Sequence, residues 1–292
     1  MRVKNLISAV MIAALTIAVS AVQAQTTLPE TVPVGGSPNK ADLTGFGAVA
    51  YAYKIGKYEV TNAKFAAFLN AVNKTNTHKL YDGRMAGEYG GITRSGDAGS
   101  YTYAVKDGWG KKPVNFVTWE TAIRYTNWLT NGPGKGDTET GSYTITDGKV
   151  TVPDHAKLAA GKETKWVLPS EDEWYKAAYY DPNKPGGAGY WKYPAKSDDA
   201  PEANINTNAP TVVGFHAKSI SPYGTFDQGG NMWEYNESRK GGKVGLRGGS
   251  FYINDNDSYL RSATRYDVLS AKWPNYGFRV AALGGSTSKK IQ

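Results

Sequence analysis

The segment 229–235, Gly-Gly-Asn-Met-Trp-Glu-Tyr, and the Arg-Gly-Gly-Ser-Phe run at 247–251 constrain the fold more than any other part of the chain. Paired glycines allow tight turns and a positive φ. Two large aromatic residues flank a single carboxylate, Glu234. The segment lacks the apolar periodicity of a simple core strand, so it predicts a short loop rather than a strand of the core.

Four residues of this loop predict a metal site. Asp227, Gly230, Met232 and Glu234 offer two carboxylates and two main-chain carbonyls within eight positions. Hard oxygen ligands of this kind suit calcium, which accepts carboxylates and carbonyls in flexible geometry. The alternative is a glycine turn with a solvated acid and two core aromatics, since oxygen-rich turns are common.

The composition indicates a loop-rich protein whose core is closed by large rings. The chain has 292 residues with 8 Trp, 20 Tyr and 8 Phe beside 34 Gly and 14 Pro, which is enough for one large domain or two small ones. The absence of cysteine rules out disulfides and thiol chemistry. The net charge of +8 is scattered along the chain, so we expect no nucleic-acid partner.

Residues 1–24 have the pattern of a secretory signal. Arg2 and Lys4 give a positive start, an apolar run extends from Leu6 to Val22, and we place cleavage after Ala24. An uncleaved anchor is the alternative. No second apolar run is long enough to span a bilayer. We therefore expect an exported protein, periplasmic or extracellular, with no membrane association after cleavage.

The remainder of the chain divides into three parts. Residues 25–45 are rich in Thr, Pro, Gly and Asn and predict a linker or an extended lead-in. Residues 46–284 predict the domain, and residues 285–292 predict a disordered tail. The segment 113–117 is apolar and predicts a short strand. The polar stretch 132–164 predicts hairpins.

Three helices have recognisable starts. Thr61 or Asn62 can cap a helix with apolar residues at helical spacing, and Thr118 can cap a second that runs to Leu129. Ser170 and Glu173 have the spacing of a capping box before a third helix.

Several motifs, taken together, resemble a known family. They are the segments 57–62, 168–174, 230–235, 247–251 and 277–280. In order and separation they resemble the formylglycine-generating enzyme, or sulfatase-modifying factor, family over residues 48–283. The resemblance implies one α+β domain with the C-type-lectin-like fold, in which a few short helices and strands are joined by long loops.

The resemblance also implies calcium. The family binds it at the positions that match Asp227, Gly230, Met232 and Glu234. Asp227 stands where the family often has asparagine, and the carboxylate keeps an oxygen ligand while adding charge. A second family site begins at the match to Asn204 and Ile205, but the acidic loop that completes it is shortened in this chain.

The oxidase chemistry of the family does not carry over. Its members use two cysteines that bind copper, since thiolates suit Cu(I); these positions fall near Ile253 and Asp257, and Ser262 replaces a further cysteine. We expect no formylglycine-generating activity by this route and no copper.

Iron-dependent relatives, such as the sulfoxide synthases, use histidines. Here His78, His155 and His216 lie far apart in sequence and outside the shared motifs. We interpret them as surface or loop residues and expect no iron.

The alignment predicts that the catalytic groove persists as a binding cleft. Ser250, Asp257, Arg265 and Asn275 would line it, with Tyr266 nearby. The alternative is that Arg265 and Asn275 bond only local backbone and that the aromatic residues belong to the core.

We therefore expect an exported, calcium-stabilised binding or scaffold protein whose partner is a peptide, a protein or a glycan. One alternative is an oxidoreductase of the same family, of the formylglycine-generating or nonheme-iron type, that uses an unidentified metal site. The other is a carbohydrate-binding module, which the fold and the aromatic content favour. Whether the chain is an enzyme stays open at this point.

Overall fold

The computed structural model describes residues 28–35, 38–134, 136–252 and 256–285. The predicted signal at 1–24, Ile253 and nearly all of the predicted tail lie outside the described residues. Within the described ranges, no helix has the length and apolar character needed to cross a membrane.

The described helices are short. They are α2 (Asn62–Val72), α3 (Trp119–Asn131), α4 (His155–Ala159) and α5 (Glu171–Tyr179), with 3₁₀ turns η1 (Gly83–Ala86) and η2 (Asp257–Leu260). The strands are β1 (Thr31–Val34), β2 (Tyr53–Gly56), β3 (Ile92–Ser95), β4 (Thr102–Val105), β5 (Thr144–Thr146), β6 (Lys149–Thr151), β7 (Lys165–Val167), β8 (Tyr180–Asp181), β9 (Gly189–Tyr190), β10 (Trp233–Lys240), β11 (Lys243–Arg247), β12 (Tyr266–Leu269), β13 (Tyr276–Phe278) and β14 (Ala281–Leu283).

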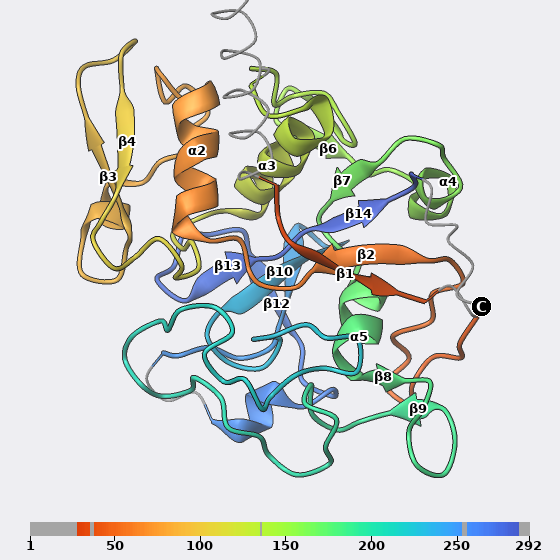
Figure 1. The fold of residues 1–292 in the computed structure, drawn as a ribbon. Coiled ribbons are helices and arrows are strands. Elements are labelled where there is room, and N and C mark those ends of the chain that lie inside the picture. Colours follow the sequence, from red (N-terminus) through yellow and green to blue (C-terminus); the bar gives the residue numbers. More distant parts are fainter. Residues whose placement is uncertain (1–27, 36–37, 135, 253–255, 286–292) are drawn as a thin grey trace, which may run out of the picture.

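Two four-stranded sheets form the centre of the described part. The first has the order β1-β2-β14-β7 and is antiparallel throughout. The second has the order β12-β11-β10-β13, in which β10 and β13 run parallel. Figure 1 shows α2 and α3 on one side of these sheets, and the long loops between β9 and β10 on the opposite side, beyond α5.

The predicted helix starts are confirmed. Thr61 and Thr118 cap α2 and α3 through their side-chain oxygens. At α5 the capping box is complete, because Ser170 accepts from the amide of Glu173 and Glu173 accepts from the amide of Ser170. Each cap satisfies an amide that the helix itself cannot bond.

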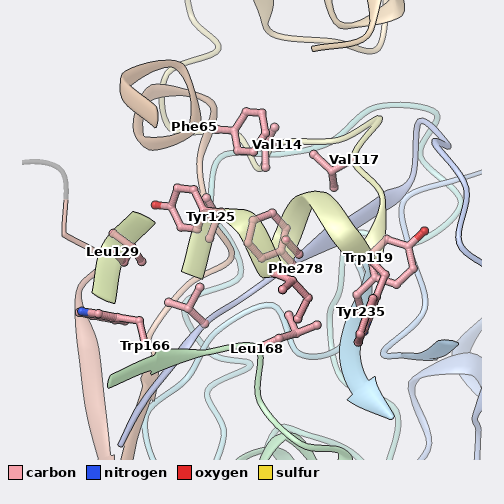
Figure 2. Packing of buried hydrophobic residues seen from close by; sticks show 14 of the residues in the cluster. Phe65, Val114, Val117, Trp119, Tyr125, Leu129, Trp166, Leu168, Tyr235 and Phe278 are labelled. Carbon is pink, nitrogen blue, oxygen red and sulfur yellow. The ribbon is translucent and has the colours of Figure 1, made fainter. Parts of the chain in front are cut away.

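The core is built from rings, as the composition predicts. Figure 2 shows Tyr125 of α3 against Phe65 of α2 and Phe278 of β13. The ring centroids of Tyr125 and Phe278 are 5.5 Å apart, and all three residues are fully buried. Burial of each such side chain contributes roughly 1.5–3 kcal/mol. The packing fixes α3 across the strands that carry the glycine-rich motifs.

One prediction of local structure is wrong: the apolar segment 113–117 forms only an isolated bridge, between Pro113 and Thr61. The stretch 25–45, expected as a linker or an extended lead-in, contains β1, which pairs with β2, and Asp42 in this stretch accepts a hydrogen bond from Tyr175 of α5. The polar stretch 132–164 forms a hairpin of β5 and β6, as expected, and also contains α4.

Candidate functional site

The strand β10 presents two different environments through adjacent residues. Side chains alternate between the faces of a strand, so Trp233 and Glu234 point in opposite directions. Trp233 lines a surface pocket, whereas Glu234 is fully buried. The two sides of this strand form the two parts of the candidate site.

Glu234 is held by matched donors. Its Oε1 accepts from Nη2 of Arg279 at 2.6 Å, and its Oε2 accepts from Nε of Arg279 and from the indole of Trp174, both at 2.7 Å. Arg279 also donates to the carbonyls of Gly56 and Phe226. Burial alone lowers the pKa of Arg279, but Glu234 outweighs it and raises the pKa. The two carboxylate oxygens of Glu234 thus accept three hydrogen bonds, two of them from the guanidinium of Arg279.

Two further carboxylates lie near this pair. Asp227, at φ 60°, accepts from the amide of Gly214 at 2.6 Å, and burial raises its pKa to about 6. Glu59 is 2% exposed, and its Oε2 accepts from Nδ2 of Asn231 at 2.7 Å. Burial, and then the charge of Asp227, raise the pKa of Glu59 well above its ordinary value. Three buried carboxylates thus interact electrostatically with the guanidinium of Arg279, and Glu234 is the one that contacts it.

The loop that carries the predicted calcium ligands is closely packed. Gly230 has φ 86°, and a Cβ there would lie 2.7 Å from the carbonyl oxygen of Asn204, so only glycine fits. No group of three or more His, Asp or Glu side chains in the described ranges is arranged to hold a metal ion. A calcium ion would therefore depend on Asp227 together with the main-chain carbonyls of Gly230 and Met232. The oxygen donors and the excess negative charge fit that ion.

The residues of the predicted second calcium site have another role. The carbonyl of Asn204 accepts from the amide of Asn231 at 2.8 Å, and its side-chain oxygen accepts from the hydroxyl of Thr207. Ile205, the next residue, is partly exposed. Asn204 is buried and fastens its loop to Asn231.

On the other side of β10 lies an aromatic pocket of about 250 Å³. All four strands of the second sheet and η2 contribute to its lining, which consists of Trp233, Leu246, Tyr259, Tyr266, Val268, Asn275 and Tyr276. The ring centroid of Trp233 lies 5.1 Å from that of Tyr266 and 5.6 Å from that of Tyr259. Tyr266 is 42% exposed, so the pocket opens to solvent.

The structure brings together only some of the predicted cleft residues. Tyr266 and Asn275 line the pocket, and Ser250 is buried behind them, where its hydroxyl accepts from Nδ2 of Asn275 at 3.0 Å. Asp257 begins η2 but faces Tyr193 and Arg261, with half of its side chain exposed. Asp257 is not part of the pocket lining.

Arg265 does not lie in the pocket. Its Nε donates to Glu171 at 2.7 Å, and its other nitrogens donate to Asp267 and to the hydroxyl of Ser238. Glu171 also accepts from Nε of Arg247, the arginine of the 247–251 motif, at 2.8 Å. The partners of Arg265 are side chains rather than local backbone. Sequence reasoning missed Glu171, whose only signal was its place in the motif 168–174.

His155 was expected on the surface or in a loop, and that interpretation is wrong. It is buried at the start of α4, with Nδ1 2.9 Å from Glu173 and Nε2 2.8 Å from Glu237. Burial by itself lowers its pKa, but the two carboxylates outweigh burial and raise the pKa to about 10. His78 instead lies 3.6 Å from Glu139. The structure does not gather the histidines into one site.

The fold and its glycine-rich loops define an α+β domain of the C-type-lectin-like class. The chain belongs to the Sulfatase-modifying factor enzyme 1-like domain family, which it matches over residues 20–283. The fold class predicted from the sequence, and the predicted family, are thereby confirmed.

Solved structures show the same fold at low sequence identity. CarF matches with a TM-score of 0.53 and 20% identity, over 87% of this chain and 98% of that one. Treponema denticola variable protein 1 matches with a TM-score of 0.51 and 18% identity, over 86% and 94% of the two chains. A search of curated proteins finds no match.

Proposed function

We propose that this chain is an exported binding protein that takes a peptide side chain or a sugar ring into the aromatic pocket. The observation that carries the proposal is the lining of that pocket, in which four rings surround one amide: Trp233, Tyr259, Tyr266 and Tyr276 beside Asn275. Rings of this kind stack on sugars and on apolar side chains, and a single amide fixes orientation.

The size of the pocket limits what it can hold. A volume of about 250 Å³ lies just below the range of pockets that hold drug-sized ligands, roughly 300–1,000 Å³. One side chain of a peptide or protein, or one ring of a glycan, fits this space. The rest of such a partner would extend over the exposed surface beside Tyr266.

The absence of cysteine supports a binding role over copper-dependent oxidation. Calcium, held by Asp227 with Gly230 and Met232, is proposed to brace the loop that begins β10. Export rests on the signal pattern of residues 1–24. The alternative oxidoreductase would use iron or copper, so metal analysis of purified protein separates the two. Stoichiometric iron or copper contradicts the binding proposal, and calcium alone supports it.

Glycan and peptide arrays test the binding role directly. We expect specific binding by the wild type and at least a tenfold loss in Tyr266→Ala, which removes one wall of the pocket. Leu269→Ala is the matched control, since Leu269 lies on the same strand but outside the pocket. Binding that Tyr266→Ala and Leu269→Ala weaken equally would contradict this site, and silence on both arrays would contradict the proposed ligand classes.

A further inference from the structure

A second cavity, of about 390 Å³, lies where β2 leads into α2. Its lining consists of Leu28, Pro29, Glu30, Tyr58, Glu59, Thr61 and Lys64. Most of these residues are partly exposed, but Glu59 is 2% exposed. The cavity therefore reaches from the surface to a buried carboxylate on the acidic side of β10.

The carboxylate of Glu59 is only half bonded. Oε2 accepts from Asn231, whereas Oε1 has no hydrogen-bond partner among the described residues. Buried polar atoms without a partner are rare in folded proteins, and each one calls for an explanation such as an ion. The unbonded atom is an oxygen, the donor that calcium accepts.

The charges around Glu59 do not balance. Besides burial, the charges of Asp227 and then Glu234 raise the pKa of Glu59, whereas the charge of Arg279 lowers it. Because three donor contacts from Arg279 and Trp174 occupy Glu234, the excess negative charge rests on Glu59 and Asp227. A divalent cation bound by Glu59 would offset this charge, and Glu59 reaches the glycine-rich loop through its hydrogen bond with Asn231, which stands between Gly230 and Met232.

We propose that Glu59 is a calcium ligand, joining Asp227 and the carbonyls of the glycine-rich loop, with the 390 Å³ cavity as the route of entry. The inference rests on the proposed calcium site and adds a residue that the resemblance did not supply. Glu234 then supports the site through Arg279 instead of providing the second full carboxylate. A protonated Glu59 without metal is the competing explanation.

Calcium titration of two variants tests this assignment. Glu59→Gln keeps an acceptor for Asn231 and removes the charge. Glu30→Gln is the matched control, because Glu30 lines the same cavity but pairs with Lys57 at the surface. The measurements are the calcium Kd by calorimetry and Tm with calcium or with EDTA.

We expect Glu59→Gln to raise the Kd for calcium at least tenfold and to lose the rise in Tm that calcium gives the wild type. In EDTA the variant should melt at or above the wild-type temperature, since a like-charge contact is relieved. Glu30→Gln should stay within twofold of the wild-type Kd.

Three results would overturn the inference. If Glu59→Gln lowers Tm equally with calcium and with EDTA, Glu59 is only an acceptor for Asn231. If the wild type shows no calcium binding, the proposed calcium site fails together with this inference, and protonation explains Glu59. Calcium binding that Glu59→Gln leaves unchanged would remove Glu59 alone, and the array experiments on the aromatic pocket are independent of both.

Discussion

The two sides of β10 differ in chemistry: one side holds a buried ion pair, and the other lines an open aromatic pocket. On one side Glu234 and Arg279 are both fully buried, and their charges are matched through two of the shortest contacts in the cluster. On the other side Trp233 and its neighbouring rings leave a cavity open to solvent. The charged side requires every partner to be present, whereas the aromatic side tolerates change. We therefore expect fold stability to depend on the first side, and we propose that ligand binding depends on the second.

Removal of Arg279 should have the largest effect. Arg279→Met leaves Glu234 buried without its cation, and we expect a loss of about 3–5 kcal/mol of unfolding free energy. Urea unfolding measures it. The control is Arg84→Met, because Arg84 is largely exposed and pairs with Asp82 at the surface, where an ion pair contributes about 0–1 kcal/mol. Equal losses in the two variants would break the comparison.

His155 should make the stability of the fold depend on pH. Its pKa is raised from 6.5 to about 10 in the folded state, so its contribution is complete below about pH 6.5 and disappears as pH rises through 10. The stability advantage of wild type over His155→Gln should fall by up to about 1.4 kcal/mol per pH unit between these limits. Denaturation at pH 6 to 9.5 measures the difference.

Burial lowers the pKa of Lys176 to about 8, so its contribution to stability increases as pH rises above 8. Because the wild type and His155→Gln both contain Lys176, this contribution cancels in the difference between them. A pH-independent difference between wild type and His155→Gln would show that His155 is neutral in the fold.

The smallest expected effects on stability come from two adjacent residues at the start of β12, Arg265 and Tyr266, whose removal should separate stability from ligand binding. Arg265→Ala removes charged hydrogen bonds to Glu171 and should cost about 1.5–3 kcal/mol of stability, with ligand binding preserved. Tyr266→Ala should cost less than about 1 kcal/mol, because the ring is 42% exposed, yet reduce array binding tenfold. If Arg265→Ala also abolished binding by the folded protein, Arg265 would belong to the cleft as first predicted.

Local signals in the sequence predicted the helices well. Thr61, Thr118 and Ser170 satisfy amides within a few residues of themselves, so chain neighbours contain the information. The glycine motif at 229–231 was equally informative, because the close approach of Gly230 to Asn204 excludes any other residue. Together with the order of the motifs, these signals were sufficient for the fold class.

The candidate site was predictable only in part. Tyr266 and Asn275 line a pocket whose role as a binding cleft stays a prediction, whereas the direction of Arg265 depends on Glu171, which lies on α5 far earlier in the chain. Glu59 and Asp227 likewise meet through tertiary packing that no local spacing records. His155 was misinterpreted because the two carboxylates that pair with it lie on other elements, far from it in the sequence. Pairings between distant segments are what a single sequence conceals.

The place of β14 has a consequence for biogenesis. β14, the last strand among the described residues, is an inner strand of the first sheet, inserted between β2 and β7. During synthesis from the amino end, β1 can pair with β2, but β7 cannot join their sheet until residues 281–283 have been made. The four-stranded sheet is therefore completed late, after every other strand that belongs to it.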